Sequence, residues 1–208
     1  MNRRAMTKHN TILAAITLGL CVALSGCGTG QPTEQAPLAG AAIGGPFTLV
    51  DKQEKPVSWS DFDGKYRIVY FGYTFCPDAC PMDVQVAMQG FAGFERAHPD
   101  LAAQVQPIFI SIDPARDTPK VVGEFAAAFH PRLLGLTGSA EAVDKAAKAF
   151  AAYYAKGKET EGGYLMDHTR VAYLMGRKGE PIAMLPVELQ PQAKAVKAVT
   201  AELTKWVK

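Results

Sequence analysis

Residues 67–81 read RIVYFGYTFCPDACP and contain the features that decide the fold. Residues 67–73 are nearly all apolar or aromatic, as in a strand that is buried on both faces of a sheet. Cys76 and Cys80 follow, and apolar residues at spacings of three and four then predict a helix over residues 80–97. This order places both thiols at the carboxyl end of a central strand, where open α/β sheets have their functional sites.

The remainder of the chain alternates predicted strands and helices. Thr118 and Ser139 are typical N-cap residues, and each precedes a predicted helix. The other predicted elements are an N-terminal β-hairpin at residues 47–50 and 56–58, strands at 106–112, 133–137, 171–175 and 182–185, and a final helix at 192–207. This order predicts an α/β fold, a thioredoxin-like three-layer sandwich with a central mixed β-sheet flanked by helices.

The N-terminus has the pattern of an export signal. Three cations in the first eight residues precede an apolar run over residues 11–24, which is short for a membrane span of roughly twenty residues. The sequence LSGC at residues 24–27 resembles a bacterial lipobox, in which the cysteine is lipidated after cleavage. We therefore expect residues 1–26 to be a lipoprotein signal peptide and Cys27 to carry the lipid. The alternative is an ordinary signal peptide with an incidental cysteine.

The expected mature chain consists of a tether and one domain. Residues 27–45 are rich in glycine, proline, glutamine and alanine without an apolar period, which predicts a flexible linker. Residues 46–208 are long enough for one domain with its own core. A lipid on Cys27 would anchor this domain to a membrane of the bacterial cell envelope, on the periplasmic side. Loss of the signal's cations takes the formal net charge from +2 to −1, and without a basic stripe nothing indicates nucleic-acid binding.

Cysteine use points to chemistry rather than to a structural disulfide. After processing, Cys76 and Cys80 would be the remaining thiols, and a disulfide between them would close a loop too small to stabilise the fold much. Together with one histidine, two thiolates make the soft ligand set that copper favours. The same thiols could instead cycle through a disulfide. Two cysteines and a histidine with an open position also describe some zinc sites.

His168 is the histidine that the sequence places best for contact with these thiols. It precedes the predicted strand at residues 171–175, which is expected to lie beside the cysteine-bearing strand. His98 and His130 each precede a proline where a predicted helix ends. We therefore expect both of these side chains to be exposed and neither to be a ligand.

Three stretches of the chain resemble motifs of the Sco/SenC family. They are FGYTFCPDACP at residues 71–81, SIDPARDTP at 111–119 and DHT at 167–169, in that order. The similarity extends across the domain from about Phe47 onward. Three motifs in the right order make the resemblance specific, and it implies a thioredoxin-like fold.

The resemblance also implies a site and a role. In the Sco/SenC family the two motif cysteines and the histidine bind one copper ion, which here implies Cys76, Cys80 and His168 as ligands of Cu(I) or Cu(II). It further implies delivery of copper to the binuclear copper site of cytochrome c oxidase subunit II, with other periplasmic copper chaperones as further partners. A metallochaperone of this kind binds and delivers its ion, so we expect a binding protein rather than an enzyme.

Two other activities remain open for the same residues. A thiol–disulfide oxidoreductase would keep the oxidase copper-site cysteines, or other exported thiols, reduced. Thioredoxin-type enzymes usually carry C-x-x-C and a proline just before the strand that here follows His168, and this chain has neither feature. A thiol peroxidase would use one attacking cysteine with a nearby threonine and arginine, for which Thr74 and Arg170 are available. That activity would need neither the second cysteine nor His168.

Four aspartates are candidates to support the ligands through hydrogen bonds. Asp113 and Asp117 follow the end of a predicted strand and could hydrogen-bond to the metal loop. A turn and a helix cap are the alternative interpretation of these two residues. Asp78 could fix the loop or complement the helix dipole, and Asp167 could orient His168.

Overall fold

The computed structural model describes residues 34–161 and 163–208. The predicted signal peptide, residues 1–26, and the predicted lipidation site, Cys27, lie outside these ranges. Residues Gln35–Lys208 make up one structural unit. Within the described ranges, no helix is long and apolar enough to cross a membrane.

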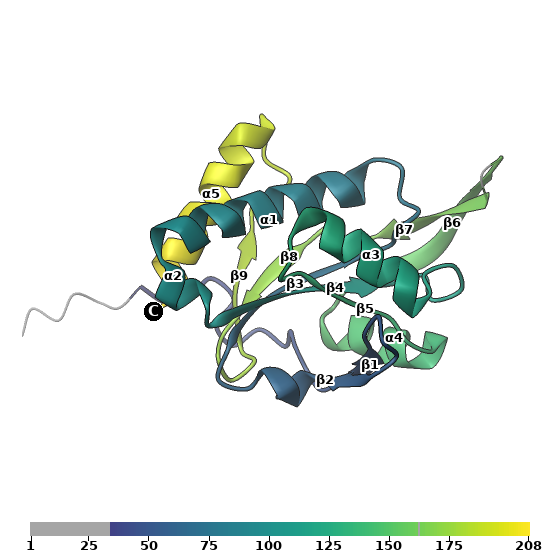
Figure 1. Cartoon of the computed structure of the whole chain (residues 1–208), viewed down its shortest axis with the longest axis horizontal. Helices are drawn as coiled ribbons and strands as arrows, with labels where there is room; N and C mark the ends of the chain where they lie inside the picture. The colour runs from purple at the N-terminus through teal and green to yellow at the C-terminus, as the bar shows by residue number, and fades with distance from the viewer. Residues whose placement is uncertain (1–33, 162) are drawn as a thin grey trace, which may run out of the picture. The chain divides into compact units, whose positions relative to one another are not determined.

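A five-stranded mixed sheet forms the centre of the fold (Figure 1). Its strands, in spatial order, are β5 (Leu134–Leu136), β4 (Val105–Ser111), β3 (Tyr66–Gly72), β8 (Ala172–Met175) and β9 (Pro181–Leu185). β3 is parallel to β4, and β4 is parallel to β5, whereas β8 is antiparallel to both of its neighbours. Because β3 is the central strand, elements cover both of its faces, which explains the unbroken apolar run in its sequence.

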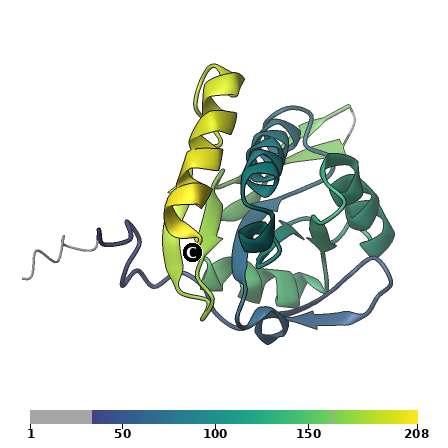
Figure 2. The same cartoon turned by 60° about the vertical axis from the view of Figure 1, so that its left-hand side comes forward.

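Helices cover both faces of this sheet, as predicted for a three-layer sandwich. They are α1 (Ala79–Ala97), α2 (Pro99–Ala102), α3 (Pro119–Phe129), α4 (Ala140–Ala149) and α5 (Gln192–Trp206), and the N-terminal hairpin consists of β1 (Thr48–Val50) and β2 (Pro56–Ser58). α1, α3 and α5 lie on one side, with α5 packed along α1, and α4 lies on the other side with the hairpin (Figure 1 and Figure 2). The predicted caps are present, since Thr118 Oγ1 and Ser139 Oγ each accept a hydrogen bond from a first-turn amide.

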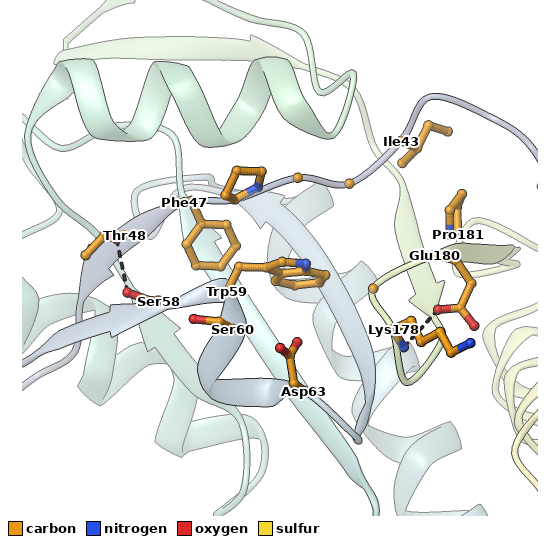
Figure 3. Close-up of a pocket in the computed structure, with 14 residues that line it drawn as sticks. Ile43, Phe47, Thr48, Ser58, Trp59, Ser60, Asp63, Lys178, Glu180 and Pro181 are labelled. Carbon is orange, nitrogen blue, oxygen red and sulfur yellow. Dashed lines mark hydrogen bonds between the residues drawn. The ribbon is translucent and has the colours of Figure 1, made fainter.

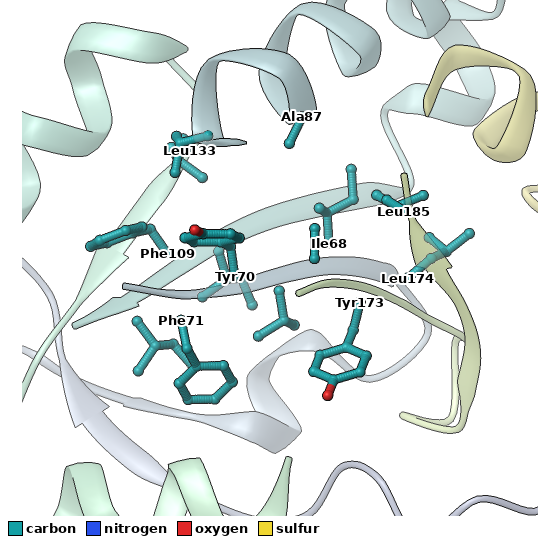
Figure 4. Packing of buried hydrophobic residues seen from close by; sticks show 14 of the residues in the cluster. Ile68, Tyr70, Phe71, Ala87, Phe109, Leu133, Tyr173, Leu174 and Leu185 are labelled. Carbon is teal, nitrogen blue, oxygen red and sulfur yellow. The ribbon is translucent and has the colours of Figure 1, made fainter. Parts of the chain in front are cut away.

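Side chains of β3 alternate between the two layers of the core (Figure 4). Ile68 and Tyr70 point toward α1, and the Tyr70 ring stacks on Phe109 with a centroid distance of 6.2 Å. Phe71 points to the opposite layer, where its ring lies 5.4 Å from that of Phe150, the residue that follows α4. Packing on both faces therefore fixes the strand whose carboxyl end leads into the cysteine loop.

A second hairpin, β6 (Tyr154–Thr160) and β7 (Gly163–His168), was not predicted from the sequence. It forms its own two-stranded sheet and is not hydrogen-bonded to the central one. Its residues include several lysines, glutamates and glycines, which disfavour strands, so the sequence carries no strand signal there. His168 is the last residue of β7, which makes this hairpin part of the candidate site.

The second half of the predicted tether lies against the domain. Leu38 N donates to Ile182 O at 3.0 Å, and Gly44 N donates to Ala149 O at 2.8 Å. Leu38 and Ile43 also pack on the core, which the surrounding alanines and glycines conceal in the sequence. The compact unit accordingly begins at Gln35 rather than at the expected boundary of residue 46.

This N-terminal segment borders a hollow of about 610 Å³ (Figure 3). Trp59 of the short 3-10 helix Trp59–Phe62 lies on one side of it, Lys178 and Glu180 of the β8–β9 turn lie across from Trp59, and Ile43 also lines it. None of its lining residues is a cysteine or a histidine, so the hollow is separate from the thiols.

Candidate metal and thiol site

The two cysteines occupy different environments within one short loop. Cys80 is the second residue of α1 and is fully buried, whereas Cys76 lies in the preceding loop and is partly exposed. Cys80 N donates to Cys76 Sγ at 3.3 Å. First-turn amides of a helix have no partner within the helix, so the start of α1 supplies a donor to the Cys76 sulfur.

Gly72 gives the Cys80 sulfur its space at the end of β3. A Cβ atom at this position would lie 3.3 Å from Cys80 Sγ and only 2.9 Å from Cε1 of Tyr70. A side chain at residue 72 would therefore have to displace the tyrosine ring and press on the sulfur. The last residue of the central strand is thus part of the site because it has no side chain.

His168 brings its ring to the buried sulfur from the other hairpin. Its Nε2 lies 3.0 Å from Cys80 Sγ, and its Nδ1 lies 3.0 Å from the carbonyl oxygen of Thr169. A carbonyl can only accept, so Nδ1 carries the proton of that bond, and in the neutral ring Nε2 presents its lone pair to the sulfur. The rings of Tyr70 and Tyr73 lie edge-on to the imidazole at centroid distances of 6.3 and 6.0 Å.

The two thiols have opposite acidities. The side chains of Cys80 and, to a smaller extent, His168 lower the pKa of Cys76 to about 3, although partial burial opposes this. The hydrogen bond to Cys76, together with burial, raises the pKa of Cys80 well above its ordinary value. At neutral pH the site therefore has a thiolate at Cys76 and a thiol at Cys80, and that thiol has two acceptors nearby, the Cys76 sulfur and His168 Nε2.

The predicted ligands lie together but do not form a preorganised metal cage. Within the described residues, no three His, Cys, Asp or Glu side chains stand in an arrangement that could hold a metal ion. Cys80 contacts both of the other residues, with its amide donating to Cys76 Sγ and its sulfur close to His168 Nε2. An ion bound by all three side chains would replace these hydrogen bonds, and their sulfur and imidazole donors suit a soft metal.

Comparison with known proteins identifies the family of this chain. The family model described as SCO1/SenC matches residues 35–204. The chain belongs to the SCO1/SenC family. It is 43% identical over 143 residues to the mitochondrial protein SCO1 homolog 1 of Arabidopsis thaliana, a match that covers 68% of this chain and 42% of that protein. The chain spans between 42% and 64% of the length of three curated relatives that it matches.

Solved structures of the SCO1/SenC family confirm the predicted thioredoxin-like fold. The crystal structure of Arabidopsis thaliana ScoI with copper bound matches with a TM-score of 0.70 and 35% identity, and it covers 79% of this chain and 99% of that one. The structure of BsSco, a member of the Sco family of cytochrome c oxidase assembly proteins in which a disulfide switch was identified, matches with a TM-score of 0.58 and 26% identity over 80% of this chain and 99% of that one.

Asp117 holds the cysteine loop through hydrogen bonds to Thr74. This carboxylate is buried and accepts three hydrogen bonds, from Thr74 N at 3.0 Å, Thr74 Oγ1 at 2.6 Å and Ser111 Oγ at 2.6 Å. Burial raises the pKa of Asp117, and the bonds from Ser111 and Thr74 oppose that rise. The SCO1/SenC motif that contains Asp117 thus contacts the loop two residues before Cys76.

Asp113 holds the second hairpin rather than a thiol. Its carboxylate accepts from the hydroxyl of Tyr164 on β7 at 2.7 Å and from Nε of Arg116. The guanidinium of Arg116 also lies over the rings of Tyr164 and Phe75, at 3.7 and 5.0 Å from their centroids. Asp113 and Arg116 therefore connect β7 with the cysteine loop.

The carboxylates of the other two aspartates are exposed, although the backbone of Asp78 hydrogen-bonds to Cys76 and helps to lower its pKa. Asp78 occupies the N-cap position of α1 but is exposed, and its side chain makes no capping hydrogen bond. Asp167 is exposed, and its carboxylate lies over Gly157, where a Cβ would be 3.0 Å from Oδ2. The atom that meets Nδ1 of His168 is the Thr169 carbonyl oxygen.

An ion pair between Asp83, which is buried, and Arg170 lies next to the site and was not predicted from the sequence. Asp83 on α1 is buried, accepts from the Tyr70 hydroxyl at 2.9 Å, and pairs with Arg170 through both carboxylate oxygens at 2.7 and 2.9 Å. The sequence spacing could have indicated that Asp83 is buried and needs a partner. Asp83 lies three residues after Cys80, which places both on the same face of the helix. An acidic residue on a buried face requires a cation as partner.

The prediction that the His130 side chain is exposed was wrong. Its side chain is buried, with its ring edge-on to Phe91 at 5.2 Å and its Nε2 3.4 Å from Glu95 Oε2. His130 Nδ1 accepts from Arg132 N at 3.2 Å, so both ring nitrogens have partners within the protein. The following proline indicated a loop correctly, but an aromatic and a charged neighbour cover that loop.

Proposed function

We propose that this chain binds one copper ion through Cys76, Cys80 and His168 and delivers it during cytochrome c oxidase assembly, to the binuclear copper site of subunit II. The observation that carries the proposal is the 3.0 Å approach of His168 Nε2 to Cys80 Sγ, with Cys76 on the same loop. The copper-bound structure of a relative with 35% identity supports the choice of metal.

The chemistry of these side chains suits capture and release of a soft cation. Cys76 is a partly exposed thiolate and can meet the ion first. Cys80 must lose its proton before its sulfur can bind, and His168 offers the nitrogen that its Nδ1 hydrogen bond leaves free. Two thiolates suit Cu(I), and an imidazole nitrogen extends the set to Cu(II). Copper is the cargo of this protein in the proposal, not a catalyst.

The proposal includes a place in the cell. LSGC at residues 24–27 supports a lipid on Cys27 and a domain held at a membrane of the bacterial envelope, on the periplasmic side. Subunit II and other periplasmic copper chaperones would then reach the domain from the same compartment.

A second candidate function, thiol–disulfide exchange, is favoured by the unequal acidity of the two cysteines. A thiolate at Cys76 could attack a disulfide of an exported partner, forming a mixed disulfide and releasing the partner's first thiolate. Cys80 would then lose its proton and displace the second partner thiolate. The partner gains two electrons, and this chain leaves with a Cys76–Cys80 disulfide.

Copper titration of the reduced protein tests the first function. One copper per chain, with both thiols protected from a thiol reagent and with affinity reduced in His168→Ala, is the expected result. His98→Ala is the matched control, because His98 lies at the other end of α1 and contacts Phe94. Undiminished Cu(I) and Cu(II) affinity in His168→Ala would contradict the three-ligand site. No retained copper together with rapid disulfide exchange would favour the second function.

A further inference from the structure

The position of His168 relative to Cys80 is not set by the central sheet alone. His168 ends β7, and the sheet formed by β6 and β7 is separate from the five-stranded sheet. Cys80 belongs to α1, and it is the second residue of that helix. β7 runs into β8 of the central sheet through residues 169–171, and a side-chain connection between this segment and α1 would help to keep the two ligands 3.0 Å apart.

Asp83 and Arg170 make that connection. Asp83 lies three residues after Cys80 on α1, and Arg170 lies two residues after His168 in the connection between β7 and β8. Arg170 Nη2 and Nε donate to the two oxygens of Asp83 at 2.7 and 2.9 Å, a bidentate geometry that fixes direction as well as distance.

Two further contacts limit the freedom of this pair. The hydroxyl of Tyr70, on the central strand, donates to Asp83 Oδ2 at 2.9 Å, and the Tyr70 ring is itself edge-on to His168. On the outer side, Arg170 Nη1 lies 3.1 Å from Glu188 Oε1. Asp83 is 1% exposed, so a carboxylate without this cation would be buried and uncompensated.

We infer that the Asp83–Arg170 ion pair is a positioning device that holds the His168 segment against the Cys80 helix. Neither residue offers an atom to the metal, and both act through the elements that carry the ligands. The expected effect on copper binding rests on the proposed function. Substitution of residues that support metal ligands typically lowers metal affinity by roughly 10- to 100-fold. The structural part of the inference, the fixed Cys80–His168 contact, applies to the metal-free protein as well.

The test uses the double variant Asp83→Asn/Arg170→Gln. Removing both charges leaves no unpaired buried carboxylate, so this variant retains the fold better than either single neutralisation. The matched control is Glu95→Gln/Arg132→Gln, which removes a second ion pair of α1, with Nη1 and Oε1 2.8 Å apart. Asp83 and Glu95 are separated by about 18 Å of helix, so the control lies far from the thiols.

The first measurement is made without copper. In the reduced full chain, an NMR contact between the Cys80 β-protons and the His168 ring is expected in the wild type and in the control, and it is expected to be lost in Asp83→Asn/Arg170→Gln. Arg170→Lys keeps the charge but not the two-point geometry, so it should show a weakened contact. Persistence of the full contact in the double variant, or its equal loss in the control, overturns the inference.

The second measurement adds copper. Affinity should fall about 10- to 100-fold in Asp83→Asn/Arg170→Gln, with a smaller nitrogen hyperfine coupling in the Cu(II) spectrum, and should be unchanged in the control. Unchanged affinity and coupling in the double variant would also overturn the inference. A wild type that binds no copper would instead refute the proposed function, and the metal-free NMR result would still decide the role of the ion pair.

Discussion

The two cysteines of the site, only four residues apart, belong to regions with opposite physical properties. Cys76 lies on a partly exposed loop that hydrogen-bonds to Asp117 through Thr74, and its sulfur is a thiolate. Cys80 is fully buried on a helix that also carries Asp83, and its sulfur keeps a proton. The difference teaches how a site can bind and yield an ion: one ligand is accessible and charged, and the other is enclosed and becomes available only after deprotonation.

The largest expected effect concerns the acidity of Cys76. Because its pKa is lowered to about 3, the thiolate persists as the pH falls, and its alkylation rate should be nearly constant between pH 5 and pH 8. In the unfolded chain the rate should rise about tenfold per pH unit, roughly a thousandfold over the same range, because an ordinary thiol has a pKa of about 8.5.

Stopped-flow alkylation of the reduced protein, with and without denaturant, measures both pH profiles. Cys76→Ser is the control that should abolish the fast native phase and leave the slow reaction of Cys80. A native rate that rises tenfold per unit would show that the two thiols do not differ as described.

The next effect tests the attachment of the loop. Asp117→Ala leaves the Thr74 amide and two hydroxyls without their acceptor, which should lower the free energy of unfolding by about 2–4 kcal/mol. Urea denaturation of the reduced protein measures this change. Asp51→Ala, which removes a partly exposed turn carboxylate, is the comparison and should cost far less. Equal effects of the two substitutions would mean that Asp117 does not hold the loop.

A smaller effect is expected in the protons released by copper. Cys76 is already a thiolate at pH 7, so binding should release about one proton per ion, from Cys80, rather than two. Since the raised pKa of Cys80 opposes binding, apparent affinity should increase about tenfold per pH unit from pH 6 to pH 8. Calorimetry in buffers of different ionisation enthalpy counts the protons, and a value near two would contradict the assignment.

The smallest effect is expected at Asp78. This side chain is exposed and makes no capping bond, so Asp78→Asn should change stability by no more than about 0.5 kcal/mol. Thermal unfolding of Asp78→Asn and of the wild type, measured under the same conditions, checks this change in stability. A large loss would mean that the Asp78 carboxylate supports the loop in a way its contacts do not show.

Much of the fold follows from patterns that depend on neighbouring residues. The apolar run of β3, the N-caps Thr118 and Ser139 and the spacing of the last helix are local signals, and the elements formed where they indicated. The β6–β7 hairpin gave no such signal, because β6 is largely polar and the hairpin is fixed by distant contacts such as Tyr164 with Asp113. Residues 36–44 were predicted to be part of a flexible linker for a related reason. Leu38 and Ile43 pack on the core only through tertiary contacts, which leave no local pattern in the sequence.

The candidate site shows the same division. Cys76, Cys80 and His168 could be named from residue types and motif order, and the structure brings Cys80 to both of the others. The partnership of Asp83 with Arg170 joins residues 87 positions apart, and no pattern in the sequence pairs them. Long-range ion pairs of this kind depend on how elements pack, which the local sequence does not encode.

Gly72 carries a practical consequence for protein engineering. A designer who grafts residues 73–81 onto another strand–helix junction would copy both thiols and the two prolines. The graft would crowd its second thiol wherever the preceding residue has a Cβ atom, because at residue 72 that atom would lie 3.3 Å from Cys80 Sγ. The smallest portable unit therefore begins one residue earlier than the cysteine loop, with a residue that contributes only empty space.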